Sequence, residues 1–431
     1  MKYQQFIFDR YKFTPSTKTL ELFYNLDDTV QFCETYRFDF EYAEYDFREL
    51  DRALQALFFM AGVSYYKAYL PPEIIVKEGG VDGESANFYA KTWQKGLGEF
   101  FYVNHLDPHT TIDFPFAPST VYTDATPKKE RQGLLVGIGG GKDSLVTVEL
   151  LRKQFPDMMT WSLNHRSQME PLIQRIGLPH AWVERAWDTK IEELNKQDAM
   201  NGHIPISAIF ACVGTVVAIL TGKRDVVVSN EQSANEPTME YMGEHINHQY
   251  SKSQEFEQDF QKFLKRQFGE SVRYYSSLRQ FSELYVAALF AKFGFEKYKD
   301  VFSSCNRAYV RTSDRMSWCG ECSKCAFVFL ILTPFIARPA LETLWGGKNL
   351  LLDPNLEPTY RKLLGIEGDK PLDCVGEIKE SRSAMQMAFQ LYPELTGKYQ
   401  FELPADYNYR TLYSDEMPAE VRQALMQAIV S

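Results

Sequence analysis

The sequence predicts an α/β fold: a parallel-sheet domain with an N-terminal α+β region and a helical C-terminal tail. The first observation is that apolar strands alternate with helices from residue 133 onward, a pattern typical of parallel sheets that are covered on both faces. The second is a run of three glycines at residues 139–141, between an apolar strand and a helix. The third is the length of 431 residues, which is too great for one average domain. We therefore divide the chain into residues 1–128, 129–345 and 346–431.

The N-terminal region carries the signals of an antiparallel hairpin followed by a helix. Residues 20–24 and 30–36 alternate partly between apolar and polar and flank an Asn/Asp turn, which predicts two paired strands. Residues 50–60 have the apolar spacing of a helix. Four prolines among polar residues make 106–132 a predicted linker.

The central region predicts alternating strands and helices. We expect strands at residues 134–138, 158–163, 181–183 and 225–229, and helices at residues 142–151, 168–176 and 207–220. Ligands of such sheets gather where the carboxyl ends of the strands meet. Three loops should therefore lie together: residues 139–144, the segment after Leu163, and residues 229–238.

Charge and hydropathy exclude several classes of partner. The formal charge of −10 argues against nonspecific nucleic-acid binding, which depends on neutralising phosphates. The first residues lack the apolar core of a signal peptide. No stretch reaches the ~18–20 apolar residues that span a bilayer. We expect a cytoplasmic protein with no nucleic-acid or membrane partner, and the oligomeric state is left open.

Residues 139–144 have the composition of a phosphate-binding loop. Glycines let the backbone approach an anion and adopt positive φ, and the N–H groups at the start of the following helix then face the phosphates. Three residues, where a Walker A loop has four, separate Gly137 from Gly141. Lys142 stands where a dinucleotide fingerprint needs its third glycine. Both of those motifs are therefore excluded.

The run Gly139-Gly140-Gly141-Lys142-Asp143-Ser144 resembles the PP-loop of ATP pyrophosphatases, Ser-Gly-Gly-x-Asp-Ser. Enzymes with this loop cleave ATP between its α and β phosphates and adenylate an oxygen of the substrate. The resemblance implies that these six residues bind ATP, although Gly139 replaces the first serine and removes one donor. Glu231, in the polar segment 229–238, is the predicted ligand of Mg²⁺ on the phosphates, because Mg²⁺ prefers carboxylates with phosphate oxygens.

Four of the seven cysteines crowd into one short segment and predict a metal site. They are Cys305, Cys319, Cys322 and Cys325, and the last three form two C-x-x-C steps. Four thiolates suit a closed, tetrahedral structural zinc site. A ferredoxin-type run would place another cysteine three residues after Cys325, where apolar residues stand instead. Zinc is therefore favoured over the alternative, an iron–sulfur cluster.

Two families share parts of this pattern. The glycine-rich loop together with the Cys-x-x-Cys-x-x-Cys run resembles the deazaguanine nitrile synthases of queuosine biosynthesis, but only over the central part of the chain. A wider resemblance covers nearly the whole chain and includes residues 62–67, 71–73, 95–100 and 201–205. These segments, with the glycine-rich loop, resemble the ATP-dependent UDP-N-acetylmuramoyl-L-alanyl-L-glutamate epimerase family of the MurL type. Its members invert the terminal L-Glu of a peptidoglycan precursor to D-Glu.

That resemblance implies a UDP-linked muramoyl dipeptide substrate, an acyl-adenylate, and release of AMP and pyrophosphate. A free carboxylate next to the glutamate Cα disfavours loss of its proton, and adenylation removes that charge. A base and an acid on opposite faces can then invert the centre. His203 and His248 are predicted for this role because histidine titrates near neutral pH, with Glu231 as a further candidate. Predicted substrate contacts are Asn201, Asn235, Lys252 and Arg311.

Two other functions stay open at this point. Another adenylating enzyme of the same fold, similar to the nitrile synthases or forming an amide, would release AMP and pyrophosphate without changing a glutamate centre. A regulatory module that binds ATP without turnover would release no AMP. The sequence leaves open which carboxylate is adenylated.

Overall fold

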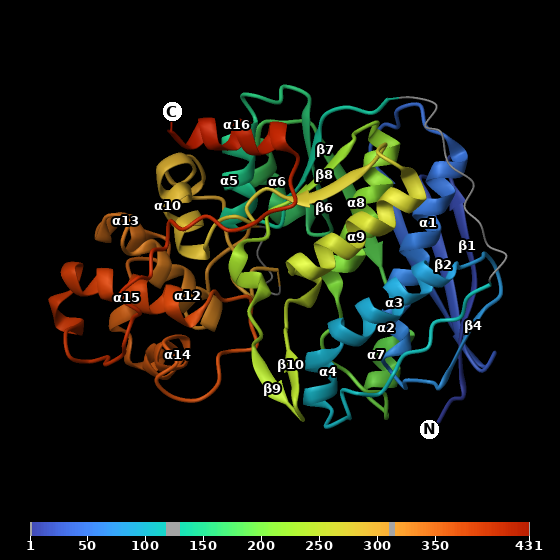
Figure 1. Ribbon diagram of the computed structural model, residues 1–431, viewed down its shortest axis with the longest axis horizontal. Helices are drawn as coiled ribbons and strands as arrows, with labels where there is room; N and C mark the ends of the chain where they lie inside the picture. The colour runs from blue at the N-terminus through green and yellow to red at the C-terminus, as the bar shows by residue number, and fades with distance from the viewer. Residues whose placement is uncertain (1, 118–129, 310–314, 431) are drawn as a thin grey trace.

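The computed structural model describes residues 2–117, 130–309 and 315–430. Within these ranges, nine strands form one sheet in the order β11-β8-β5-β6-β7-β3-β2-β1-β4 (Figure 1). The strands from β11 to β7 all pair parallel to their neighbours, as predicted for the central region. They are β5 (Leu134–Gly137), β6 (Met158–Leu163), β7 (His180–Ala186), β8 (Asp225–Val228) and β11 (Arg273–Ser276).

The N-terminal strands extend this same sheet. They are β1 (Gln5–Thr14), β2 (Thr19–Leu26), β3 (Val30–Asp39) and β4 (Glu73–Val76). The predicted hairpin is confirmed, because β2 pairs antiparallel with β3. Strand β3 then pairs antiparallel with β7, from Thr35 opposite Ala186 to Asp39 opposite Trp182. The N-terminal region is thus joined edge to edge to the parallel strands, and the division of the chain into three parts stays a prediction.

Helices cover both faces of the sheet, and the alternation along the strands decides which core each residue enters. Leu135 of β5 and Val226 of β8 belong to one core, whereas Val136 and Val227 belong to the other. The first core is closed by α1 (Phe47–Ala61), α2 (Val63–Tyr66), α3 (Gly83–Gly96), α4 (Gly98–Val103), α7 (Lys190–Asn195), α8 (Ile206–Thr221) and α9 (Gln254–Phe268). The second is closed by α5 (Lys142–Leu151), α6 (Arg166–Ile176), α10 (Glu283–Phe293) and α11 (Phe295–Tyr298).

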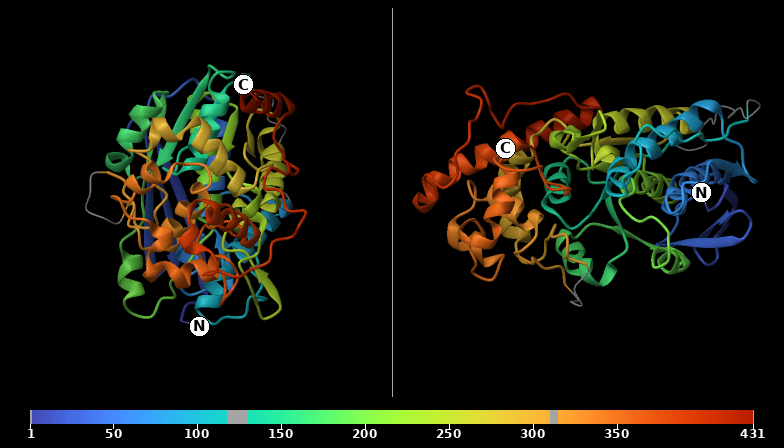
Figure 2. Two further views of the ribbon diagram at one scale, coloured as in Figure 1. Left: turned by 90° about the vertical axis from the view of Figure 1, so that its left-hand side faces the viewer. Right: turned by 90° about the horizontal axis from the view of Figure 1, so that it is seen from below.

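The C-terminal region, residues 346–431, is helical, as predicted, and extends the second core. Its α-helices are α14 (Glu357–Leu363), α15 (Ile378–Leu391) and α16 (Ala419–Val430). Helices α12 (Ser323–Leu332) and α13 (Arg338–Thr343) precede it and pack into the same core. Figure 2 shows most of them at one end of the molecule, with the N-terminal strands at the opposite end. Across the described ranges, no helix combines the length and apolar character that crossing a membrane requires.

Local sequence identified most central elements to within a few residues. The predicted strand at 158–163 coincides with β6, and the predicted helix at 207–220 lies within α8. Strands β1 and β11 and helices α9 and α10 were not predicted. A short ribbon, β9 (Met239–Tyr241) with β10 (Glu244–Ile246), follows β8. Residues 118–129 of the predicted linker lie outside the described ranges.

A buried ion pair lies where β3 meets β7. Arg185 Nε donates to Glu34 Oε1 at 2.8 Å, and Arg185 Nη2 donates to Ser64 Oγ at 2.9 Å. Tyr36 donates its hydroxyl to the same Glu34 carboxylate at 2.6 Å. The side chains of Arg185 and Glu34 are 3% and 0% exposed. Because an unpaired buried charge is costly, these partners favour the observed register of β3 on β7.

Replacing Arg185 by Met should destabilise the fold strongly. The substitution leaves the Glu34 carboxylate buried without its cation, which costs about 3–5 kcal/mol of unfolding free energy. The surface pair of Arg338 with Glu342, whose arginine is 44% exposed, provides the control: Arg338→Met should cost no more than about 1 kcal/mol. Urea unfolding followed by tryptophan fluorescence measures both, and equal midpoints for the two variants would contradict the assignment.

Candidate active site

The glycine-rich loop between β5 and α5 presents an open helix start. Gly140 has φ of 89°, a conformation that side chains disfavour. A Cβ atom at Gly140 would lie 2.7 Å from both Met316 Sδ and Tyr309 Oη. Gly141 stands at the N-cap of α5, and no side chain of the described residues caps that helix. The first N–H groups of α5 are therefore available to an anion, as in a phosphate-binding loop.

Buried charges surround the start of α5. Lys142 Nζ lies 2.8 Å from Glu283 Oε1, with both side chains 2% exposed, and it also contacts the Asp143 carboxylate. Burial raises the pKa of Glu283, and the nearby Glu231 and Asp143 carboxylates raise it further. Glu283 Oε2 is buried and has no hydrogen-bond partner within the described ranges. These carboxylates beside the glycine-rich loop are oxygen donors of the kind that Mg²⁺ prefers.

The loop after β8 lies beside the glycine-rich loop, as expected. Thr147 of α5 and Ser229 share a hydrogen bond of 2.8 Å between their hydroxyl oxygens. Glu231 accepts a hydrogen bond from Ser233 Oγ at 3.2 Å. Asn235 is committed to the structure of the loop, since its Oδ1 accepts from the backbone N–H of Gln254 at 2.6 Å.

A second group of titratable side chains lies next to these loops. His248 Nδ1 contacts Glu99 Oε2, and His203 Nδ1 lies 3.9 Å from the same oxygen. The two imidazole rings are 4.5 Å apart between centroids. Sequence reasoning named both histidines but missed Glu99, which lies in α4 of the N-terminal region.

The two histidines differ in protonation. Burial lowers the pKa of His203 to about 4, and the neighbouring His248 and Lys252 add to the effect. Burial also acts to lower the pKa of His248, but the neighbouring Cys374 and Glu99 raise that pKa to about 9. At neutral pH, His203 is therefore a neutral base and His248 a cation.

Cys374 is the residue that the sequence did not reveal. Lys252 Nζ donates to its Sγ at 3.2 Å, and the His248 ring lies close to the same thiol. Burial acts to raise the pKa of this thiol, but Lys252, His248 and Lys324 together lower it to about 6. Cys374 lies in a polar loop with no local motif around it, so no signal in the sequence distinguished it.

Lys252 connects the two groups into one site. Burial acts to lower the pKa of its ammonium, whereas Cys374, Glu231 and Asp143 raise it to about 12. The carboxylates beside the glycine-rich loop and the thiol beside the histidines thus face one half-buried cation. The structure brings together five predicted residues in this way: Asp143, His203, Glu231, His248 and Lys252.

Of the remaining two predicted substrate contacts, the structure describes one. Asn201 borders the histidine group, but its Oδ1 already accepts a hydrogen bond from Lys67 Nζ at 2.9 Å. Burial lowers the pKa of that lysine to about 8. Arg311 lies outside the described residues.

The four clustered cysteines converge as predicted. Their Sγ atoms all lie within 4.8 Å of one another, with 3.9 Å between Cys305 and Cys322 and 3.7 Å between Cys319 and Cys325. In a tetrahedral site with Zn–S bonds of ~2.3 Å, neighbouring sulfurs are about 3.8 Å apart. The cluster could therefore hold a metal such as zinc.

The cysteine segment also positions the loop that carries Cys374. Asn306 Nδ2 donates to Asp373 Oδ1 at 2.6 Å, and Ser323 Oγ contacts the other oxygen of Asp373. Lys324 Nζ contacts the carbonyl oxygen of Cys374. Residues next to the cysteine ligands thus fix the backbone on both sides of the peptide bond that joins Asp373 to Cys374.

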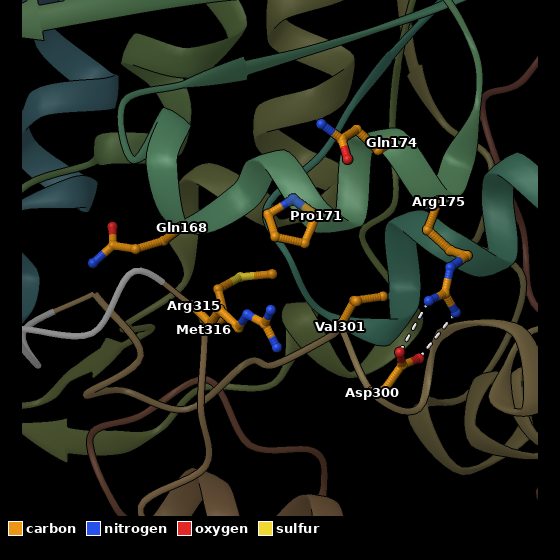
Figure 3. Close-up of a pocket in the computed structure, with 8 residues that line it drawn as sticks. All are labelled: Gln168, Pro171, Gln174, Arg175, Asp300, Val301, Arg315 and Met316. Atoms are coloured by element: carbon orange, nitrogen blue, oxygen red, sulfur yellow. Dashed lines mark hydrogen bonds and ion pairs between the residues drawn. The ribbon is translucent and has the colours of Figure 1, made fainter.

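A pocket of about 450 Å³ opens beside the glycine-rich loop, between α6 and the segment around Asp300 (Figure 3). Arg175 and Asp300 form an ion pair of 2.9 Å on one side of it. Met316 lines the pocket and also limits the space at Gly140. The pocket borders the glycine-rich loop through Met316, and its lining includes neither His203 and His248 nor Cys374. Its lining residues are Gln168, Pro171, Gln174, Arg175, Asp300, Val301, Arg315 and Met316.

Comparison with known proteins gave matches along most of the chain. Residues 1–277 match the MurL N-terminal domain, and residues 301–396 match the MurL C-terminal domain. The chain is 41% identical over 338 residues to the UDP-N-acetyl-alpha-D-muramoyl-L-alanyl-L-glutamate epimerase of Xanthomonas oryzae pv. oryzae, a match that covers 78% of this chain and 74% of the relative. It is 38% identical over 339 residues to the protein of the same name from Salinispora tropica, covering 78% of this chain and 73% of that relative.

We expect the purified protein to contain about one zinc ion per chain, held by the four clustered thiolates. Cys322→Ser should abolish most of this zinc content and lower the thermal midpoint, because the segment loses its central tie. Cys33→Ser, which alters a half-buried thiol outside the cluster, is the control and should keep the metal. Elemental analysis measures the content, and a Cys322→Ser protein with undiminished zinc would contradict the site.

Proposed function

The chain belongs to the MurL family, and on this premise we propose that it inverts the terminal L-Glu of UDP-N-acetylmuramoyl-L-alanyl-L-glutamate to D-Glu during peptidoglycan precursor synthesis. The names of its relatives supply the substrate. We further propose that the reaction consumes ATP through an acyl-adenylate, releases AMP and pyrophosphate, and takes place on a PP-loop fold. The proposed location is the cytoplasm, where such nucleotide-linked precursors are made.

The observation that carries the ATP proposal is the uncapped start of α5 behind Gly140. In this proposal residues 139–144 hold the phosphates of ATP, with N–H groups and the helix dipole directed at the negative charge. Asp143, Glu231 and Glu283 would hold Mg²⁺, which would neutralise charge on the phosphates. The buried Oε2 atom of Glu283 supports this set, because a buried carboxylate oxygen without a partner favours a cation.

The second part of the proposal is proton transfer at the glutamate Cα. Adenylation converts the carboxylate into an uncharged acyl group, so the carbanion formed beside it gains enolate resonance. His203, which is neutral, could accept a proton, and His248, which is protonated, could donate one. Glu231 is a further candidate. Asn201, Asn235, Lys252 and Arg311 stay proposed substrate contacts, with Lys252 best placed to face an anionic group.

Purified protein with ATP, Mg²⁺ and UDP-N-acetylmuramoyl-L-alanyl-L-glutamate should release AMP and pyrophosphate while L-Glu becomes D-Glu. Asp143→Ala and Ser144→Ala should each lower AMP release by about 100-fold, since both remove groups from the phosphate-binding loop. Glu192→Ala removes an exposed carboxylate from the first turn of α7 and should leave the rate unchanged. Chromatography of AMP and chiral analysis of the hydrolysed glutamate measure both products.

The other outcomes separate the alternatives. AMP release without inversion would keep an adenylating enzyme but move the search to another acceptor, as in the nitrile synthases. Inversion without ATP would remove the adenylate from the mechanism. Full activity of Asp143→Ala and Ser144→Ala would contradict the assignment of the loop.

A further inference from the structure

We propose that Cys374 is a catalytic residue that exchanges the Cα proton of the substrate glutamate, and that Lys252, His248 and Glu99 hold it as a thiolate. The inference rests on the proposed function, because it assigns one of the two proton-transfer groups which that function requires. It adds a residue that neither the sequence motifs nor the names of the relatives indicate.

The first support is the arrangement around the sulfur atom. Lys252 Nζ donates to Cys374 Sγ at 3.2 Å, and the His248 ring lies close enough to the same thiol to lower its pKa. His248 presents its Nδ1 to Glu99. Thiol, imidazole and carboxylate thus follow one another in the order that activates nucleophiles and bases in many enzymes, with the carboxylate orienting the ring.

The second support is the charge around this group. Lys252, Lys324 and the His248 imidazolium face the thiol, and together they favour its ionised form although burial opposes it. Glu99 faces His248, while Glu231 and Asp143 face Lys252 from the phosphate-binding side. At neutral pH the pair is a thiolate beside an imidazolium, since the pKa of Cys374 is about 6 and that of His248 about 9.

The third support is position. The Lys252 ammonium that contacts the thiol also faces Asp143 of the glycine-rich loop. Lys252 thus connects the thiol to the loop at which, in the proposed function, the acyl group is activated. The contacts of Asp373 with Asn306 and Ser323 fix the loop that carries the thiol. A rigid support of this kind is what a proton-transfer group requires.

Other uses of these residues fit less well. Burial raises the pKa of Cys33 and Cys212, so neither is a ready thiolate. The ligand atoms of Glu99, His203 and His248 lie within 4.8 Å of one another. A cation there would be repelled by the adjacent Lys252 ammonium and would displace the contact between Glu99 and His248. We therefore assign this group to proton transfer.

The step balances as follows. The Cys374 thiolate takes the Cα proton and becomes a thiol, and the electron pair of the C–H bond moves into the enolate of the acyl-adenylate. A proton from solvent, relayed by the neutral His203 imidazole, then adds to the opposite face and restores the carbonyl, and the Cys374 thiol returns its proton to solvent before the next turnover. Water finally hydrolyses the acyl-adenylate to the D-glutamyl carboxylate and AMP. In the reverse direction the Cys374 thiol donates the proton that it took.

The test separates adenylation from proton transfer. Cys374→Ala should keep substrate-dependent exchange of pyrophosphate into ATP, because the glycine-rich loop is untouched. Inversion, and uptake of deuterium at Cα in D₂O, should fall by about 100-fold or more. Cys33→Ala, which removes a half-buried thiol on β3, is the matched control and should behave as the unaltered protein. Inversion at the unaltered rate by Cys374→Ala would overturn the proposal.

A second measurement is independent of turnover. The rate at which iodoacetamide alkylates Cys374, followed by peptide mass spectrometry, should rise through a midpoint near pH 6. His248→Gln should move this midpoint upward, because the thiolate loses its imidazolium partner. An alkylation midpoint at the ordinary pKa of a cysteine thiol would overturn the proposal that Lys252, His248 and Glu99 hold Cys374 as a thiolate. If the midpoint lies near pH 6 but the unaltered protein exchanges no pyrophosphate, the proposed function fails. The assignment of Cys374 as a thiolate held by its neighbours then still stands.

Discussion

The Lys252 ammonium is the charge on which the rest of the site depends. It lies at the end of the short 3-10 helix η2 (Tyr250–Lys252), half-buried between two sets of polar groups. A buried cation is tolerated only where opposite charges compensate for its lost hydration. Asp143 and Glu231 supply that charge from the side of the glycine-rich loop, and Cys374 supplies it from the other. The need to neutralise one lysine therefore brings the glycine-rich loop and the Cys374 thiol into one site.

A second cation fixes the backbone around the first. Arg279 is fully buried and pairs with Glu257 at 2.9 Å. Its guanidinium also donates to the carbonyl oxygens of Glu231 and Lys252. One planar side chain thus holds the loop after β8 and the end of η2 at a fixed separation. Arg279 contacts none of the groups assigned to chemistry through their side chains, yet the distance between Glu231 and Lys252 depends on it.

The sequence predicted those features that depend on residues close together in the chain. The glycine-rich loop and the cysteine cluster are local motifs, and both have the geometry that their spacing indicated. Strand β1 was missed because Phe6, Ile7 and Phe8 are consecutive buried residues and interrupt the alternation of a half-buried strand. Glu99 and Cys374 were missed for a different reason. Each becomes important only through contacts with His248, which lies far away in the sequence, and no local pattern records such a contact.

In the proposed mechanism, the N-terminal region has a chemical role that its sequence did not suggest. Strand β3 joins this region to the parallel strands, and α4 then places Glu99 against His248. The thiol comes from the opposite end of the chain, within the segment that matches the MurL C-terminal domain, whereas Glu99, His248 and Lys252 fall within the MurL N-terminal domain. Neither matched segment by itself contains Cys374 together with Glu99, His248 and Lys252. The cysteine cluster positions the thiol. Its neighbouring residues Asn306 and Ser323 contact Asp373, which directly precedes Cys374. A metal ion in that cluster would thus affect proton transfer without touching the substrate, because it would keep Cys374 aligned with His248 and Glu99.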